Sequence, residues 1–221
     1  MSLHVYYGGT FDPVHNGHLA IARAARDALQ SPVTMMPAAD PPHRAAPGAS
    51  GAQRAEMLEL AVRDQPGLSV DRRELRRDAP SYSVDTLREL RAEWGQDAPI
   101  VLVLGADSFL GLPTWREWRV LLTLAHLVVA ERAESPLDGA LPTLLADALS
   151  RCWTDTPEVL LQSPAGRVLQ LRQPLHRASA TAIRCRIAVG APWRHAVPEA
   201  VAEYIQQRGL YRDGTAQAPS L

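Results

Sequence analysis

The sequence predicts an α/β fold, with an open parallel sheet, helices on both faces of the sheet and a small helical portion at the C-terminal end. Three observations lead to this prediction. Short apolar runs alternate with helical patterns along the chain. Helix caps stand at several of the boundaries between them. A chain of 221 residues with 46% hydrophobic content can bury one good core.

The strands are predicted from five apolar runs, each bounded by turn residues or by a helical pattern. A strand, a helix and a second strand in this order are typical of βαβ units, so we expect parallel strands in a Rossmann-like arrangement. The predicted strands are residues 3–7, 33–36, 68–70, 100–104 and 127–130.

The helices are predicted from apolar spacing and from caps. The first carries an apolar face from Leu19 to Leu29, and its first turn holds residues 16–18. Ser50 and Gln53 form a capping box for the next. A later helix begins near residue 179 and is closed by the glycine at 190. The last predicted helix has Pro198 as its first residue and Gly209 just past its end.

We expect residues 1–211 to form a single domain. Residues 38–51 and 131–139 are rich in turn-forming or polar residues and are predicted to be surface loops, too short to link two domains. Residues 212–221 have little to bury and are predicted to form a disordered tail.

Charge and composition exclude several classes of function. The 23 basic and 24 acidic residues argue against a nucleic-acid partner, which normally needs a net basic face. Every basic residue is Arg, so Schiff-base chemistry and a P-loop lysine are excluded, and phosphate must be held by Arg, His and backbone amides. Without a long apolar run or a signal segment, we expect a cytoplasmic protein with no membrane partner. Cys152 and Cys185 are expected to be reduced.

The segment 8–19 points to a nucleotide-phosphate site. Gly8, Gly9 and Thr10 follow the first strand, so backbone amides and a hydroxyl can approach a polyanion. His15 and His18 are three residues apart at the positive end of a helix dipole, where imidazoles can donate hydrogen bonds to phosphate oxygens. The alternatives are a helix cap with a core histidine, or a metal pair. Zinc is disfavoured because no Cys or acidic ligand is nearby.

Further polar residues stand where ligands bind in open parallel sheets. Asp107 follows the strand 100–104, where it can accept a hydrogen bond from a ribose hydroxyl or cap the helix that follows. Ser81 and Ser83 open a helix, either as caps or as part of an anion site. Trp115 lies in a proline-bearing turn and is either a core residue or a platform for a cationic ring.

Two more groups are candidate phosphate ligands. His43 and Arg44 lie in the loop 38–51, as a basic clamp or as solvated side chains. Ser179 precedes a helix on which Thr181 and Arg184 share a face, so that hydroxyl, amide and guanidinium donors can meet one phosphate chain. The alternative is a cap with a surface arginine.

These motifs carry a resemblance. The run from Gly9 to His18 resembles the signature of the HxGH nucleotidylyltransferase superfamily. Taken with five later segments, it is similar to the bacterial nicotinate-nucleotide adenylyltransferase family over Tyr7 to Tyr211. The later segments are 41–44, 79–83, 105–115, 179–184 and 204–211.

The resemblance implies transfer of AMP from ATP to nicotinate mononucleotide, with pyrophosphate as the second product, by in-line attack without a covalent intermediate. It implies that His15, His18 and Arg184 are catalytic and that magnesium arrives on the ATP phosphates, with no metal ligand from protein side chains. The implied ATP-binding residues are Gly8, Gly9, Thr10, His15, His18, Asp107, Ser179, Thr181 and Arg184. The implied nicotinate mononucleotide-binding residues are His43, Arg44, Tyr82, Ser83 and Trp115.

The chain departs from the family pattern in three places. Residues 38–40 stand where relatives usually carry an Asn, and Ala133-Glu134 replaces a Pro-Gly after Arg132. Ser83 stands where a Thr is frequent, which preserves the hydroxyl. A pantetheine-phosphate adenylyltransferase or a cytidylyltransferase would share the first motif but is not expected to carry 81–83 together with 113–115. A class I aminoacyl-tRNA synthetase is disfavoured, because it needs a lysine-containing loop and this chain has no lysine. A catalytically silent nucleotide-binding module is a further alternative.

Overall fold

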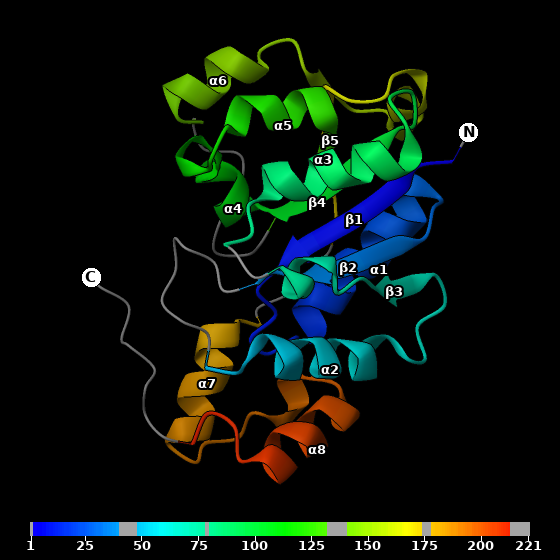
Figure 1. Cartoon of the computed structure of the whole chain (residues 1–221). Coiled ribbons are helices and arrows are strands. Elements are labelled where there is room, and N and C mark those ends of the chain that lie inside the picture. Colours follow the sequence, from blue (N-terminus) through cyan, green and yellow to red (C-terminus); the bar gives the residue numbers. More distant parts are fainter. Residues whose placement is uncertain (1, 40–47, 78–79, 132–140, 174–177, 213–221) are drawn as a thin grey trace.

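The computed structural model describes residues 2–39, 48–77, 80–131, 141–173 and 178–212. Within these residues the strands form one parallel sheet in the order β3-β2-β1-β4-β5-β7-β6 (Figure 1). The strands are β1 His4–Gly9, β2 Val33–Pro37, β3 Leu68–Val70, β4 Ile100–Gly105, β5 His126–Ala130, β6 Trp153–Thr154 and β7 Val168–Leu171.

The five predicted strands are confirmed, each within two residues at either end. β6 and β7 are not predicted from the sequence, and the reason is their weak signal. β6 has only two residues, and β7 has four, one of which is the polar Gln170. β6 forms one edge of the sheet, and β7 lies between β5 and β6.

Helices flank the sheet on both faces, as predicted. The α-helices are α1 Asn16–Leu29, α2 Gly51–Val62, α3 Ser83–Trp94, α4 Ala106–Leu110, α5 Trp118–Leu124, α6 Thr143–Leu149, α7 Ala180–Ala188 and α8 Glu199–Arg208. Short 3₁₀ turns are η1 Arg73–Arg76, η2 Leu112–Thr114, η3 Pro157–Gln162 and η4 Arg194–Ala196.

The core is divided into two layers by the sheet. Alternate strand residues point to opposite faces, so Val101 and Val103 of β4 pack with α1, α2 and α8, whereas Leu102 and Leu104 pack with α3 and α5. Figure 1 shows α3, α4, α5 and α6 gathered at one end of the view and α2, α7 and α8 at the other. The helical portion at the C-terminal end therefore covers one face of the sheet.

The predicted caps are largely confirmed. Ser50 and Gln53 form the reciprocal capping box that starts α2. Gly209 follows α8 with a φ of 63°, in the left-handed region that favours glycine. The placement of Pro198 was one residue wrong, because it is the N-cap of α8 and the helix begins at Glu199. With a ψ of 147° its backbone is extended rather than helical.

The strand order reverses at β1, which lies between β2 and β4. Chain connections leave β1 and β4 on opposite faces of the sheet, and this opens a crevice beyond their carboxyl ends, where ligands bind in open α/β sheets. The turn at 10–15 and the start of α4 both border this crevice.

Cys152 and Cys185 are free thiols. Among the described residues, no helix is both long and apolar enough to cross a membrane. The division into a domain over 1–211 and a tail over 212–221 stays a prediction, and residues 213–221 lie outside the described part of the chain.

Candidate active site

The two histidines of the first motif cap α1 reciprocally. His15 is the N-cap, and its Nδ1 accepts a hydrogen bond from the backbone N–H of His18 at 3.3 Å. In return, the Nδ1 of His18 accepts from the backbone N–H of His15 at 3.3 Å. The rings stack with their centroids 3.7 Å apart, and both side chains are buried. The cap alternative is therefore confirmed, while the role of these histidines as phosphate donors stays a prediction.

This capping determines which ring nitrogen can act as a donor. Because each Nδ1 accepts a backbone N–H, the neutral tautomer of each ring carries its proton on Nε2. The stacked pair thus presents two Nε2–H groups, and the ring orientations are held by the helix start itself. Preorganised donors of this kind suit the stabilisation of charge that develops on an oxygen in a transition state.

Gly8 and Gly9 were predicted to follow the first strand, but they are the last two residues of β1 and pair with β2. A Cβ at Gly9 would lie 2.9 Å from Cζ of Phe11, so that position has no room for a side chain. Gly8 has more space, and both glycines line the neighbouring pocket. The fully buried Arg54 donates from Nη1 to the carbonyl oxygens of Thr10 at 2.8 Å and Ala38 at 2.6 Å, which fixes the path of the turn.

Arg184 joins the late helix to this early turn. Its Nη1 donates to the carbonyl oxygen of Asp12 at 2.7 Å, and its Nη2 donates to Oγ1 of Thr181 at 3.3 Å. The arginine side chain keeps 25% of its surface exposed. Ser179 is the N-cap of α7 and makes no side-chain cap hydrogen bond. The structure thus places Ser179, Thr181 and Arg184 at the amino end of one helix, and Arg184 beside the histidine turn.

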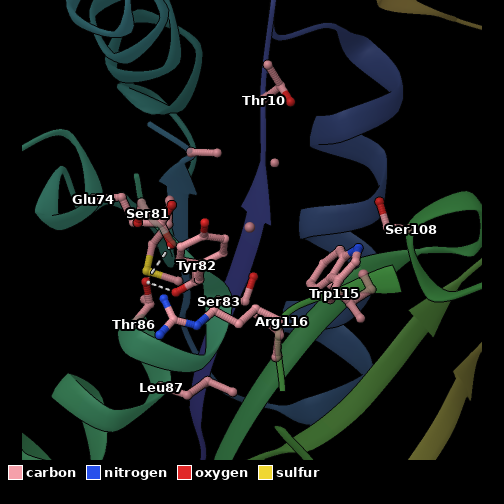
Figure 2. A pocket seen from close by; sticks show the side chains of 16 residues that line it. Thr10, Glu74, Ser81, Tyr82, Ser83, Thr86, Leu87, Ser108, Trp115 and Arg116 are labelled. Carbon is pink, nitrogen blue, oxygen red and sulfur yellow. Dashed lines mark hydrogen bonds between the residues drawn. The ribbon is translucent and has the colours of Figure 1, made fainter. Parts of the chain in front are cut away.

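A pocket opens at the carboxyl end of β1, beside Thr10 (Figure 2). Its walls come from the ends of β1, β2 and β4, from η1 and from the starts of α3 and α4. The lining residues are Gly8, Gly9, Thr10, Met36, Ala38, Glu74, Ser81, Tyr82, Ser83, Thr86, Leu87, Leu102, Leu104, Ser108, Trp115 and Arg116.

The pocket brings together three of the predicted acceptor residues, Tyr82, Ser83 and Trp115. Tyr82 is the N-cap of α3 and makes no side-chain cap hydrogen bond, and Ser83 is the first residue of the helix. Trp115 follows η2 and faces the same space (Figure 2). The guanidinium of Arg116 lies over the Tyr82 ring, 4.8 Å from its centroid. An open helix start, an indole and a guanidinium are suited to a planar anionic ligand.

A buried carboxyl group supports the wall beside Ser81. Glu74 accepts a hydrogen bond from Oγ1 of Thr86 at 2.7 Å, and Thr86 in turn accepts from Nη1 of Arg77 at 2.9 Å. The same Arg77 nitrogen donates to Oγ of Ser81. Burial raises the pKa of Glu74 above its usual range, against the opposing influence of Thr86 and Arg77.

We expect Glu74→Gln to gain stability relative to the wild type as pH rises. In the wild type, the raised pKa of the folded state means that the protonated carboxyl of Glu74 stabilises the fold. This contribution is present below the pKa of the unfolded state and is lost as pH rises through the pKa of the folded state. The glutamine does not titrate. Urea unfolding of both proteins at pH 4 and pH 7 measures the two free energies of unfolding. If the free energy of Glu74→Gln does not rise relative to that of the wild type between these pH values, the prediction is wrong.

Asp107 lies in the first turn of α4, where Gly105 is the N-cap. The alternative that Asp107 itself caps this helix was wrong, because the helix begins at Ala106, two residues before the start at Ser108 that such a cap implies. The side chain of Asp107 is exposed at the carboxyl end of β4. Ser108, the next residue, lines the pocket. His43, Arg44, Asp40 and Arg132 lie outside the described residues.

Four residues at the site were not singled out from the sequence. Arg116 is adjacent to Trp115, and Glu74 lies in the charged run 72–77, so each had a local signal that resembles an ordinary solvated charge. Asp12 and Tyr211 form a hydrogen bond at 2.7 Å across 199 positions. No local pattern can reveal such a pair.

Comparison with known proteins identifies the family. The chain matches the cytidylyltransferase-like family over residues 6–186. It is 57% identical over 220 residues to the probable nicotinate-nucleotide adenylyltransferase of Stenotrophomonas maltophilia, covering 97% of this chain and 99% of the relative. It is 46% identical over 212 residues to the protein of the same name from Marinobacter nauticus, covering 95% and 96%.

Solved structures agree on the fold. The nicotinic acid mononucleotide adenylyltransferase of Plasmodium falciparum, complexed with NaAD, superposes with a TM-score of 0.72 at 14% sequence identity, covering 96% of this chain and 98% of that one. The same enzyme complexed with APC gives a TM-score of 0.69. At this identity the likeness concerns the fold, while the sequence relatives decide the branch. The chain belongs to the cytidylyltransferase-like family and, within it, to the nicotinate-nucleotide adenylyltransferases.

Proposed function

We propose that this chain transfers AMP from ATP to nicotinate mononucleotide and releases nicotinate adenine dinucleotide and pyrophosphate, a step of NAD biosynthesis. Relatives up to 57% identical over almost the whole chain are named for this activity. The observation that carries the proposal is the 2.7 Å hydrogen bond from Arg184 to the Asp12 carbonyl oxygen. It sets a guanidinium beside the histidine turn, and the pocket of Figure 2 opens beside Gly8 and Gly9, which precede this turn.

In the proposed reaction, a phosphate oxygen of the acceptor attacks the α-phosphorus of ATP in line, and pyrophosphate leaves. No residue forms a covalent bond to the nucleotide, so catalysis rests on positioning and on stabilisation of charge. The Nε2–H groups of His15 and His18 donate to the α-phosphate and to the oxygen that bridges to the leaving group. Gly8, Gly9 and Thr10 approach the phosphates with backbone and hydroxyl donors.

The leaving group is held by the start of α7 in this proposal. Ser179 and Thr181 supply hydroxyls and amides, and Arg184 supplies the charge that compensates pyrophosphate as it departs. The exposed side of Arg184 is available for this role, since a quarter of its side-chain surface is open. Asp107, at the carboxyl end of β4, accepts from the ribose of ATP.

Nucleotidyltransferases of this kind take their nucleotide together with a divalent metal. We propose that the metal here is Mg²⁺ and that it arrives as part of the substrate, MgATP. Among the described residues, no group of three or more acidic, histidine or cysteine side chains is arranged to hold a metal ion. The carboxylate nearest the histidine turn, Asp12, is engaged by Tyr211 and by the backbone amides of 48 and 49.

The acceptor occupies the pocket of Figure 2 in this proposal. Its pyridinium ring stacks on Trp115, and its carboxylate meets the amides and hydroxyl at Ser83, where α3 begins. Tyr82 and Arg116 border the same space, and the guanidinium adds a cationic group near the carboxylate. His43 and Arg44 are proposed to contact the acceptor phosphate.

We expect nicotinate mononucleotide to be preferred over nicotinamide mononucleotide by about tenfold or more in kcat/KM. A helix amino end and charge-assisted hydrogen bonds favour a carboxylate over a neutral amide by about 1 to 3 kcal/mol. Steady-state assays with each acceptor at fixed MgATP measure the ratio. Ser83→Ala should reduce the preference, whereas Ser108→Ala, across the pocket, should leave it unchanged. Equal kcat/KM values for the two acceptors would contradict the assignment.

The function itself is tested by mixing the purified chain with MgATP and nicotinate mononucleotide and following pyrophosphate release. A silent nucleotide-binding module would bind ATP without releasing pyrophosphate, so the assay separates the two possibilities. The cytoplasmic location stays a prediction, and the oligomeric state is not predicted.

A further inference from the structure

Asp12 lies at the centre of a cluster formed by three distant segments. One carboxylate oxygen accepts from the backbone N–H of Gly48 at 2.8 Å, and the other accepts from Ala49 N–H at 3.1 Å. That second oxygen also accepts the hydroxyl of Tyr211 at 2.7 Å. The carboxylate is 3.8 Å from Nη1 of Arg184, and its side chain is only 5% exposed. A buried carboxylate in such a cluster has little freedom to move.

The Tyr211 ring packs into the same cluster. A Cβ placed on Gly48 would lie 2.9 Å from the Tyr211 ring and 3.6 Å from Cδ of Arg184. The ring, the glycine and the stem of the arginine are therefore in close proximity. Burial and the Asp12 carboxylate both raise the pKa of the Tyr211 hydroxyl, so it remains a hydrogen-bond donor at neutral pH.

The backbone around Tyr211 presents the ring to this cluster. Gly209 ends α8 in the left-handed conformation, and the N–H of Leu210 bonds to the carbonyl oxygen of Ile205 at 3.1 Å. Tyr211 itself has a φ of 65°. A non-glycine residue in this region is unfavourable and is retained only where the surroundings impose it. Here the surroundings are the hydroxyl bond to Asp12 and the packing on Gly48.

We infer that Tyr211 is a positioning residue for the triphosphate site, and that it acts through Asp12. Its hydroxyl fixes the carboxylate of Asp12, whose carbonyl oxygen orients the guanidinium of Arg184. Asp12 is also three residues before His15, so the same anchor holds the turn that carries the stacked imidazoles. This inference rests on the proposed function, because Arg184 and His15 are its proposed phosphate ligands.

The test compares two tyrosines that make the same type of bond. Tyr211→Phe removes the hydroxyl bonded to Asp12. Tyr204→Phe is the matched control, because its hydroxyl donates to the Glu56 carboxylate between α8 and α2, away from the site. We expect Tyr211→Phe to lower kcat/KM for MgATP about tenfold to a hundredfold, the range expected for loss of a charge-assisted hydrogen bond. The KM for nicotinate mononucleotide should change less than twofold, and Tyr204→Phe should match the wild type.

A purely structural role for Tyr211 gives a different result. It lowers the unfolding midpoint and leaves kcat/KM unchanged at 25 °C, and that outcome overturns the inference. If Tyr211→Phe does not fold, Gly48→Ala replaces it, since the added Cβ forces the ring away from Asp12. The same selective loss toward MgATP is expected for it, and wild-type kcat/KM would overturn the inference.

Binding of α,β-methylene-ATP by calorimetry separates this inference from the proposed function. If the wild type binds the analogue but releases no pyrophosphate from MgATP, the proposed function fails. The inference still stands in that case if Tyr211→Phe binds the analogue at least tenfold more weakly than Tyr204→Phe does. If the two variants bind it equally, or the wild type does not bind it, the inference fails.

Discussion

His18→Ala is expected to lower kcat about a thousandfold while leaving the KM for nicotinate mononucleotide within about twofold. The Nε2–H of His18 is proposed to donate to an oxygen that gains charge only in the transition state, and losing one such donor costs on the order of 10² to 10³ in rate. Single-turnover measurement of pyrophosphate release with saturating MgATP gives the chemical rate directly. A variant within tenfold of the wild-type kcat would show that the donor is wrongly assigned.

The substitution also removes a helix cap, so a second variant is needed. The Nδ1 of His18 accepts the backbone N–H of His15, and losing one such cap costs about 1 kcal/mol. His18→Gln places at the third helical position a residue that completes capping boxes in general. We expect His18→Gln to unfold at the wild-type midpoint and to be as slow as His18→Ala. Recovery of activity together with stability would indicate that the imidazole serves the helix and not the reaction.

Arg91→Met is expected to destabilise the fold by about 3 to 5 kcal/mol without changing kcat at 25 °C. Arg91 is 4% exposed, and its guanidinium donates to backbone carbonyl oxygens of several separate segments. Burial lowers the pKa of Arg91, yet the group stays charged at every ordinary pH. Removing it leaves buried acceptors without a donor, which is among the most costly changes in a protein interior. The acceptor oxygens belong to Leu124, Gly95, Gln96, Ala98 and Pro164.

Thermal and urea unfolding measure this loss, which corresponds to roughly 6 to 20 °C in the midpoint for a chain of this size. Arg88→Met is the control on the same helix, since Arg88 forms an exposed pair with Glu117 and its removal should leave the midpoint unchanged. An Arg91→Met midpoint equal to that of the control would mean that water replaces the guanidinium at its carbonyl partners.

The sequence predicts those parts of this fold that are encoded locally. The five predicted strands, the capping box at Ser50 and the left-handed Gly209 all follow from short patterns whose physical cause lies within a few residues. Pro198 shows the limit of such patterns. Proline suits both the N-cap and the first helical position, and only the extended ψ of 147° decides between them.

The site is predicted where its residues share a segment and is missed where they do not. The spacing of His15 and His18 predicts their place at the start of a helix. The sequence also predicts that residues 81–83 and 115 bind the acceptor, but it does not predict that these two segments meet in one pocket. The contact of Asp12 with Tyr211 depends on how α8 packs against the rest of the chain, which is a tertiary property. Glu74 was overlooked because a carboxyl in a charged run normally faces water, whereas this one is 9% exposed.

The bond between Arg184 and Asp12 spans 172 positions, and this separation affects how the protein is made. During translation the histidine turn and the acceptor pocket leave the ribosome long before α7 does. A nascent or prematurely terminated chain that lacks α7 therefore has no guanidinium with which to retain pyrophosphate. On the proposed roles, such a fragment is a silent by-product and not a partly active enzyme that consumes ATP.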